Sequence, residues 1–222
     1  MAKIICENVH KSYGSGKNKV DAVRGISFTF EKGRFYSIIG KSGSGKSTFL
    51  HLAGGILMPD EGRILYDSVD LAGLSEDELS KTRREMTGTI FQDYLLLPEL
   101  TVKENIIMPA VLDHRVIDED WCNEILKRLQ MEGLADRYPS ELSGGEQQRT
   151  SIGRAIMNKP DFVFADEPTG NLDRKTGEAV LDFLLAIRDL YQPMILMVTH
   201  DLDIARSADL LLHIEDGVIL DR

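Results

Sequence analysis

The stretch RFYSIIGKSGSGKST, from Arg34 to Thr48, decides the fold of this 222-residue chain. It opens with a short run of β-branched and aromatic residues, Phe35 to Ile39, which predicts a buried strand. A glycine-rich loop follows, and a helical pattern begins directly after it. The residues that fit the spacing of a phosphate-binding loop are Gly40, Gly45, Lys46 and Ser47.

The residue types of this loop suit the phosphates of a nucleotide. Gly43 and Gly45 let the backbone curl so that successive N–H groups face phosphate oxygens, and the following helix adds the positive end of its dipole. Lys46 can reach the outer phosphates, and the Ser47 hydroxyl can ligate Mg²⁺. A flexible Gly/Ser loop is the alternative, but the flanking strand and helix favour a nucleotide site. The candidate contacts are Gly40, Lys41, Ser42, Gly43, Ser44, Gly45, Lys46, Ser47 and Thr48.

Composition limits the classes of function. A formal net charge of −10 argues against a nucleic-acid partner, which would need a basic face. Cys6 and Cys122 are too few and too separated for a disulfide framework, which predicts a reducing compartment. The start MAKIICENVH lacks a signal-peptide core, and the longest apolar run, Met194 to Val198, is only strand-sized. We therefore expect a soluble, cytoplasmic protein.

Strands alternating with helices predict an α/β fold with a mainly parallel sheet. Residues 3–30 alternate apolar and polar positions and predict antiparallel strands. Pro59 to Gly62 predicts a turn before a strand from Arg63 to Tyr66, and Asp118 predicts a helix that ends at Gly133. Three capping boxes predict further helix starts, at Ser75 with Glu78, Thr101 with Glu104, and Ser143 with Glu146.

The chain from residue 93 to residue 157 has a helical texture and interrupts this pattern. We interpret it as an inserted α-helical subdomain within a single domain spanning residues 1–222. Residues 1–92 and 158–222 then form the nucleotide-binding core together with an antiparallel β subdomain.

A second motif, DFVFADEP, delivers Asp166 and Glu167 at the carboxyl end of an apolar strand. Parallel α/β sheets bind ligands at that edge, so both acids should lie beside the phosphate loop. Asp166 would hold Mg²⁺, and Glu167 could polarise an attacking water. A pair of solvated acids is the alternative, but the preceding phosphate loop favours catalysis.

The third motif is LSGGEQQR, from Leu142 to Arg149. A serine and two glycines at a helix start make a nest of N–H groups for an anion, although a capped surface helix would also explain them. With this octet, the chain resembles the nucleotide-binding subunit of ATP-binding cassette (ABC) transporters over essentially its whole length. The resemblance implies a P-loop NTPase (RecA-like) core with a mainly parallel sheet, an antiparallel β subdomain and an inserted α-helical subdomain.

The resemblance also implies roles for single residues. Tyr13 matches the aromatic residue that stacks on adenine, and Gln92 matches the glutamine that touches Mg²⁺ and the attacking water. Ser143, Gly144, Gly145 and Glu146 match the signature, which contacts ATP held by a second cassette. Glu167 matches the catalytic base, and His200 matches the histidine that contacts the γ-phosphate. The implied catalytic residues are thus Glu167, His200, Lys46 and Gln92, and the implied Mg²⁺ ligands are Ser47, Gln92 and Asp166.

Asn171, Leu172 and Asp173 match the family's dimer-interface loop, which makes Asp173 a further candidate contact to the nucleotide. Within the family, EPTGNLD and LTVKENIIMP are similar to the lipoprotein-release, macrolide-export and antimicrobial-peptide-export group. Asp93-Tyr94-Leu95 departs from the aromatic-Asn-Leu order that often follows the glutamine. Thr150 and Gly153 are a second departure, because small apolar residues are commoner at those positions.

The predicted function is an ATPase subunit, peripheral on the inner face of the cell membrane, that drives an integral-membrane permease by ATP-dependent pairing of two cassettes. One alternative is a cassette that regulates a non-transporting complex, such as cell-wall hydrolase control at division. A translation-type protein would carry two cassettes, and a DNA-repair type would need long heptad arms. The run Tyr94 to Pro98 either fills the helical subdomain's core or receives a permease helix.

Overall fold

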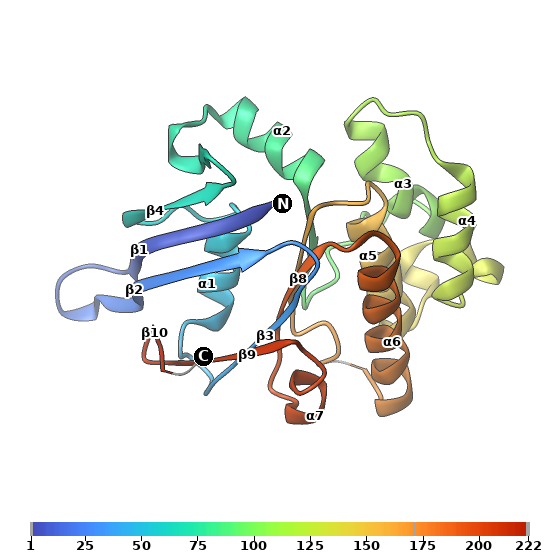
Figure 1. Cartoon of the computed structure of the whole chain (residues 1–222). Helices are drawn as coiled ribbons and strands as arrows, with labels where there is room; N and C mark the ends of the chain where they lie inside the picture. The colour runs from blue at the N-terminus through green and yellow to red at the C-terminus, as the bar shows by residue number, and fades with distance from the viewer. Residues whose placement is uncertain (1, 171, 221–222) are drawn as a thin grey trace.

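Two sheets, seven α-helices and four short 3-10 helices make up the computed structural model, which describes residues 2–170 and 172–220, the side chain of Lys17 excepted. Figure 1 shows the antiparallel strands on one side of α1 and the helices α3 to α5 on the far side of the central strands. The strands are β1 (Lys3–Tyr13), β2 (Val20–Glu31), β3 (Phe35–Ile39), β4 (Glu61–Tyr66), β5 (Val69–Asp70), β6 (Thr87–Ile90), β7 (Phe162–Asp166), β8 (Met194–Val198), β9 (Leu210–Glu215) and β10 (Val218–Ile219). The helices are α1 (Lys46–Ala53), α2 (Glu76–Met86), α3 (Val102–Leu112), α4 (Glu119–Arg128), α5 (Gly144–Ile156), α6 (Arg174–Tyr191) and α7 (Leu202–Ala205).

The strand order confirms the predicted α/β class. The smaller sheet has the order β2-β1-β4-β5, and all of its paired strands are antiparallel. The larger sheet has the order β10-β9-β3-β8-β7-β6, in which the strands from β9 to β6 are parallel and only β10 is antiparallel. The parallel strands, among them β3, β8, β7 and β6, therefore end at one edge.

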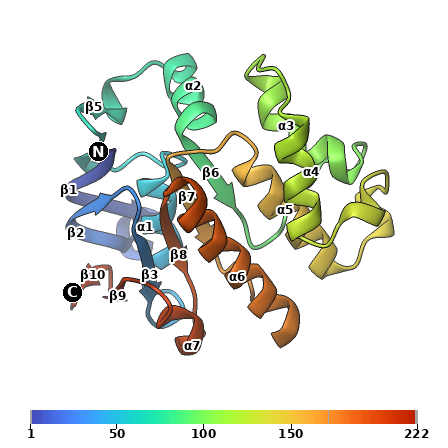
Figure 2. The ribbon, with the colours of Figure 1, turned by 45° about the vertical axis from the view of Figure 1, so that its right-hand side comes forward.

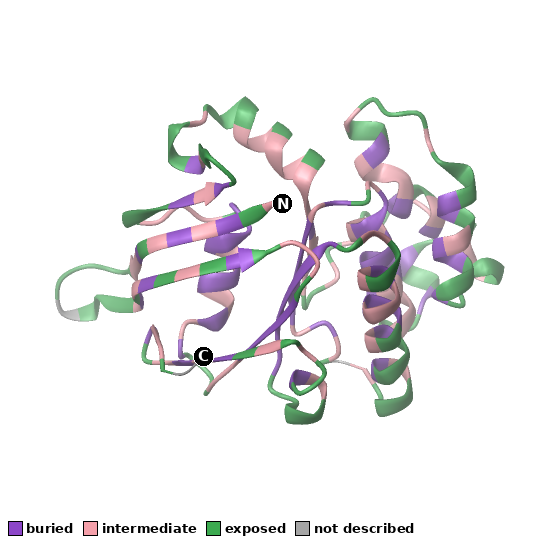
Figure 3. Cartoon of the chain, in the orientation of Figure 1, coloured by how far each residue is buried: buried purple, intermediate pink, exposed green. Residues whose placement is uncertain are grey.

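Apolar side chains fill both faces of the larger sheet. Phe162 and Phe164 of β7 belong to a core shared with α1 and the antiparallel sheet, whereas Val163 and Ala165 belong to a core shared with α3 to α6. Figure 3 shows the central strands buried along their length, while β1 and β2 alternate between buried and exposed residues. A strand covered on both faces needs an unbroken apolar run, which explains the sequences of β7 and β8. It follows that α1 and α5 lie on opposite faces of this sheet (Figure 2).

The three predicted capping boxes are present at the starts of α2, α3 and α5. Two predicted boundaries are wrong. The strand β4 begins at Glu61, inside the predicted turn, because Glu61 pairs with His10 of β1. The helix α4 ends at Arg128 and not at Gly133. Gln130 adopts a left-handed conformation, and the next N–H, that of Met131, closes onto the carbonyl of Leu126 at 2.7 Å, so a non-glycine residue ends this helix.

Candidate functional site

Four loops leave the larger sheet side by side. The register places Ile38, Val198 and Asp166 in one row across β3, β8 and β7, and Ile90 of β6 lies opposite Ala165. The loops that follow these strands carry the predicted phosphate loop, the predicted histidine, the two predicted acids and the predicted glutamine. The structure therefore gathers these sequence-predicted residues at the edge where α/β proteins bind ligands.

The phosphate loop is wedged against two neighbouring strands. A Cβ atom added to Gly45 would lie 2.0 Å from the carbonyl oxygen of Ala22 in β2, and one added to Gly40 would lie 2.1 Å from the carbonyl oxygen of Ile214 in β9. Both glycines also have positive φ angles, 99° and 154°. Glycine is thus required at these two positions by space as well as by backbone conformation.

Lys46 and Ser47 open α1 and face the loop and β7. The Lys46 ammonium donates to the carbonyl oxygen of Lys41 at 2.9 Å while the side chain is buried, which leaves two of its three N–H groups for a further acceptor. The Ser47 hydroxyl donates to Asp166 Oδ1 at 2.9 Å. A hydroxyl, a carboxylate and an ammonium are therefore concentrated at the start of one helix, where the helix dipole favours an anion.

His51 also lies in this cluster, although none of the sequence motifs includes it. Its Nε2 atom is 3.6 Å from Asp166 Oδ2, and the ring lies near Phe91, with the two ring centroids 6.1 Å apart. The signal in the sequence is its position four residues after Ser47, which puts both side chains on the same face of α1. Asp166 is thus flanked by two residues of that helix.

Burial raises the pKa of the Asp166 carboxyl above its ordinary value, an effect that the Ser47 hydrogen bond and His51 oppose. At a pH between the ordinary and the raised pKa, the folded protein holds a proton on Asp166 that the unfolded chain has released. The stability that this proton confers is complete below the ordinary carboxyl pKa and is lost as the pH rises through the raised value. At neutral pH the buried charge therefore destabilises the fold when neither nucleotide nor metal is bound.

Asp166→Asn is accordingly expected to stabilise the nucleotide-free protein at pH 7. A gain of 1 kcal/mol would raise the midpoint of thermal unfolding by about 2–4 °C in a protein of this size, and the gain should shrink towards pH 4. Differential scanning calorimetry over this pH range without Mg²⁺ measures it. Asp182→Asn, at an exposed carboxylate on α6, is the control and should leave the midpoint unchanged. A lower midpoint for Asp166→Asn at pH 7 would contradict the prediction.

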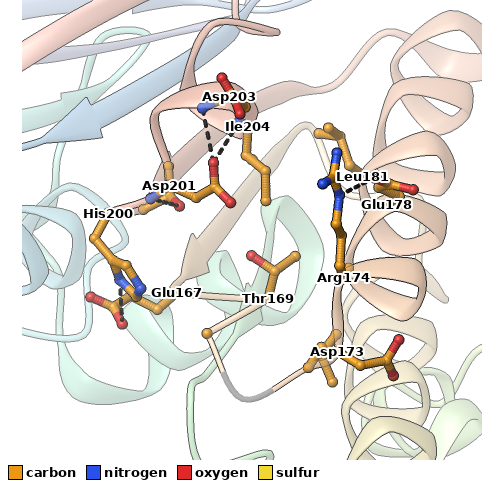
Figure 4. A pocket seen from close by; sticks show the side chains of 14 residues that line it. Glu167, Thr169, Asp173, Arg174, Glu178, Leu181, His200, Asp201, Asp203 and Ile204 are labelled. Carbon is orange, nitrogen blue, oxygen red and sulfur yellow. Dashed lines mark hydrogen bonds and ion pairs between the residues drawn. The ribbon is translucent and has the colours of Figure 1, made fainter.

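Glu167 and His200 face one another across the ends of β7 and β8. His200 Nδ1 lies 3.3 Å from Glu167 Oε2, and Figure 4 shows the two side chains pointing together at one end of a cleft of about 480 Å³. Glu167 has a left-handed backbone, with φ at 45°, and its N–H donates to the Val198 carbonyl at 3.0 Å. Such a conformation costs a non-glycine residue about 1–2 kcal/mol and is concentrated at functional sites.

Tyr13 and Gln92 border the cluster. Tyr13 ends β1 opposite Val20 of β2, and its side chain is 44% exposed, which leaves an aromatic face open to a ligand. The same strand β2 contributes Ala22, against which Gly45 packs, so the tyrosine and the phosphate loop lie along one hairpin. Gln92 follows β6 by two residues and is exposed at the edge of the sheet.

The signature residues are not brought to the phosphate loop. Ser143 caps α5, which packs on the opposite face of the sheet from α1. The Glu146 carboxylate accepts from the Ser143 N–H at 2.7 Å and from its hydroxyl at 2.8 Å, so it orients the serine. A Cβ on Gly145 would lie 3.4 Å from Thr176 of α6. Ser143 and Gly144 are exposed, which leaves their end of the helix accessible to a second molecule.

The interface loop predicted at residues 171–173 is described in part. Asn171 lies outside the described residues. Asp173 caps α6, where its carboxylate accepts from the N–H and from the hydroxyl of Thr176 at 3.1 and 2.6 Å. These hydrogen bonds lower the pKa of Asp173. Its carboxylate is therefore engaged in starting the helix beside the cleft.

Comparison with known proteins finds likeness over nearly the whole chain. The family described as "ABC transporter" matches residues 23–170. The ATP-binding protein LolD of the lipoprotein-releasing system of Buchnera aphidicola subsp. Schizaphis graminum is 41% identical over 214 residues, which cover 96% of this chain and 93% of LolD. The macrolide export ATP-binding/permease protein MacB of Neisseria meningitidis serogroup B is 42% identical over 223 residues, 99% of this chain but only 34% of MacB.

Among solved structures, the chain is similar to the dimeric post-hydrolysis state of the ATP-binding cassette MJ0796 of Methanocaldococcus jannaschii bound to ADP and Pi. The TM-score is 0.92 at 36% sequence identity, and the match covers 98% of this chain and 97% of that one. Within residues 2–170 and 172–220, no helix is both long and apolar enough to cross a membrane.

Proposed function

The chain belongs to the ABC transporter family and is an ATP-binding cassette ATPase, and we propose from this premise that it drives the membrane permease of an export or lipoprotein-releasing system, like the systems to which MacB and LolD belong. The observation that carries the proposal is the separation of the phosphate loop from the signature on opposite faces of one sheet. One chain then holds two half-sites. A second copy, paired head to tail, would complete both of them, and the similar cassette MJ0796 is dimeric.

In the proposed mechanism, the chain's own residues divide the work of hydrolysis. Lys46 and the N–H groups of the phosphate loop bind and neutralise the phosphates, and the partner's signature adds a nest of N–H groups over the γ-phosphate. Glu167 accepts the proton of the attacking water. His200, which contacts Glu167, orients that water and the γ-phosphate. Tyr13 supplies the aromatic face on which the adenine stacks.

The donor set at the start of α1 fits Mg²⁺. This ion is usually held by one or two carboxylates, with phosphate oxygens and waters among its remaining ligands. Ser47 Oγ and Asp166 Oδ1 lie 2.9 Å apart and would hold it, with Gln92 reaching it from β6. Among the described residues, no three His, Cys, Asp or Glu side chains are grouped as a metal cage. When bound, Mg²⁺ would neutralise phosphate charge and also the carboxylate charge that burial disfavours at Asp166.

The arrangement of the core supports the proposed division of the chain. The helices between residues 93 and 157 pack on one face of the larger sheet and share that core with α6, whereas α1 and the antiparallel sheet share the other core. We propose that residues 93–157 form a helical subdomain on a nucleotide-binding core of residues 1–92 and 158–222. The division separates the phosphate loop from the signature.

The run Tyr94 to Pro98 supports a docking site for the permease on the inner face of the membrane. Leu95 and Leu97 are 56% and 37% exposed, so these two leucines do not fill the interior. Their loop is nevertheless well fixed, because Asn105 accepts from the Leu97 N–H and donates to the Leu97 carbonyl at 2.9 and 3.0 Å. Exposed leucines on an anchored loop suit a short amphipathic helix of a membrane partner.

Leu95→Asp together with Leu97→Asp is therefore expected to uncouple the subunit. Basal ATPase activity should stay within about twofold of the wild type, because both side chains are exposed and neither belongs to the proposed nucleotide site. Association with the membrane partner should fall at least about tenfold, because two carboxylates would have to be desolvated in the contact. Co-purification of the tagged chain with an integral-membrane protein, followed by ATPase assay of the eluate, measures both.

Val116→Asp is the matched control, because Val116 is apolar and 95% exposed outside this loop. It should leave co-purification unchanged. Unfolding of the Leu95/Leu97 variant would show that the leucines serve packing. If the variant folds and associates with the membrane partner as the wild type does, this loop is not the docking site.

A further inference from the structure

Two consecutive residues after Gln92 hold an unfavourable backbone conformation. Tyr94 and Leu95 have φ angles of 60° and 48°, in the left-handed region that side chains disfavour. Each such residue costs about 1–2 kcal/mol, and neither is a glycine or an asparagine. A conformation of this kind persists only where surrounding contacts determine it, and it is typical of functional segments.

Arg154 provides those contacts from the last turn of α5. Its guanidinium donates to the Tyr94 carbonyl at 2.8 Å and to the Leu95 carbonyl at 2.6 Å. The planar fork of an arginine matches two adjacent acceptors in a way that a lysine cannot. Burial lowers the pKa of this guanidinium. Arg154 thus fixes the backbone of the loop to α5.

The side chain of Tyr94 reaches the other end of the same helix. A Cβ atom added to Gly144, the first residue of α5, would lie 3.1 Å from the Tyr94 hydroxyl oxygen. Gly144 does not have a positive φ, so its backbone would accept other residues, and the Tyr94 hydroxyl lies next to the space that a side chain there would enter. Residues 144 and 154 are about 15 Å apart along the helix axis, and the side chains of Arg154 and Tyr94 together span that length. Figure 2 shows the chain leaving β6 and passing beside α5.

We propose that Tyr94 is a positioning residue that makes the Gln92 loop and the first turn of α5 move as one unit. Arg154 locks the backbone end of this strut, and the hydroxyl rests on Gly144, directly beside Ser143. A displacement of the loop would then be carried to the signature. This inference rests on the proposed function, in which the signature binds the ATP held by a second copy. This gives Tyr94 a role in pairing without any contact to the nucleotide of its own chain.

Amide hydrogen exchange on the isolated chain tests the strut without any dimer. Arg154→Lys keeps the charge but loses the fork. It should increase exchange about tenfold for the loop amides at 94 and 95 and also for the amides of Glu146 and Gln147, which bond to Ser143. Amides between residues 150 and 153, nearer to the substitution, should be unchanged. Tyr94→Phe should increase exchange only at Glu146 and Gln147.

The control is Tyr191→Phe, which removes a buried hydroxyl that has no hydrogen-bond partner and should change none of these amides. The proposal is overturned if Glu146 and Gln147 keep their protection in both Tyr94→Phe and Arg154→Lys. It is also overturned if Arg154→Lys increases exchange along all of α5, because the helix would then simply be destabilised.

Pairing gives the functional readout. In a chain that already carries Glu167→Gln, Tyr94→Phe should weaken the ATP-dependent dimer about tenfold while ATP affinity and the unfolding midpoint stay unchanged. Analytical ultracentrifugation measures the dimer. If Glu167→Gln alone does not pair, the proposed function fails while the exchange experiment still decides the strut. If it pairs equally well with Tyr94→Phe, the strut carries nothing to the signature and the inference is wrong.

Discussion

Glu167→Gln is expected to slow ATP hydrolysis by about 10³-fold while ATP binding stays normal. The amide keeps the shape of the side chain and its contact with His200 but cannot accept the proton of the attacking water. Phosphate release and nucleotide affinity, measured on the same preparation, separate the two effects. Glu178→Gln is the matched control, because Glu178 lines the same cleft but pairs with Arg174 at 2.9 Å. A normal hydrolysis rate in Glu167→Gln would remove Glu167 as the base.

The same variant should accumulate as an ATP-bound dimer. ATP joins the two half-sites, and without hydrolysis nothing releases them, so light scattering after size-exclusion chromatography should report twice the monomer mass. Ser143→Arg, added to Glu167→Gln, should abolish this dimer because a bulky side chain cannot enter the nest over the γ-phosphate. ATP affinity of the monomer should survive, because Ser143 lies on the other face of the sheet. A dimer that forms equally well with Ser143→Arg would place the signature outside the interface.

Lys46→Ala is expected to abolish measurable turnover and to weaken ATP binding by about 10²–10³-fold. The substitution removes the buried ammonium at the start of α1, and charge-assisted contacts to phosphate are among the strongest polar interactions in proteins. Binding of a fluorescent ATP analogue measures the loss. Lys81→Ala, at an exposed lysine of α2 that pairs with Glu85, should bind normally. Unchanged affinity in Lys46→Ala would refute the nucleotide site.

Mixing Lys46→Ala with Ser143→Arg extends this prediction. Each variant alone should be inactive, because every site in its own dimer lacks one half. A mixed pair keeps one intact site, formed by the phosphate loop of one chain and the signature of the other. An equimolar mixture should therefore recover about a quarter of wild-type activity when the sites act independently. No recovery would mean that the two motifs act within one chain.

The loops after β3, β6, β7 and β8 could be predicted to meet because parallel strands end at one edge, and each loop carries a motif with a chemical reason. Helix starts were equally readable, since a capping box is a contact between residues three apart. The position of His51 beside Asp166 could not be predicted from the sequence. It needed the position of β7 against α1, a contact 115 residues away in sequence, and an isolated histidine gives no such information.

Other features depend on contacts for which local sequence has no signal. Gly45 is fixed by the carbonyl of Ala22, and α4 ends at Arg128, just before a left-handed Gln130, although a glycine follows three residues after Gln130. The position of Tyr94 beside Gly144 could not be predicted, because it depends on the path of the whole loop along α5. The resemblance to a family supplied roles for single residues, but the physical reasons for Gly45, His51 and Tyr94 came from the packing.

Placing α1 and α5 on opposite faces of one sheet has a kinetic consequence. In the proposed mechanism one chain does not complete a site for hydrolysis, so at low concentration the reaction should be second order in protein and should fade on dilution. Anchoring two chains to one permease would make their encounter intramolecular, at an effective concentration in the millimolar range for a short connection. The ATPase would then be inactive as a free subunit and active when bound to the permease, and no separate inhibitor would be needed.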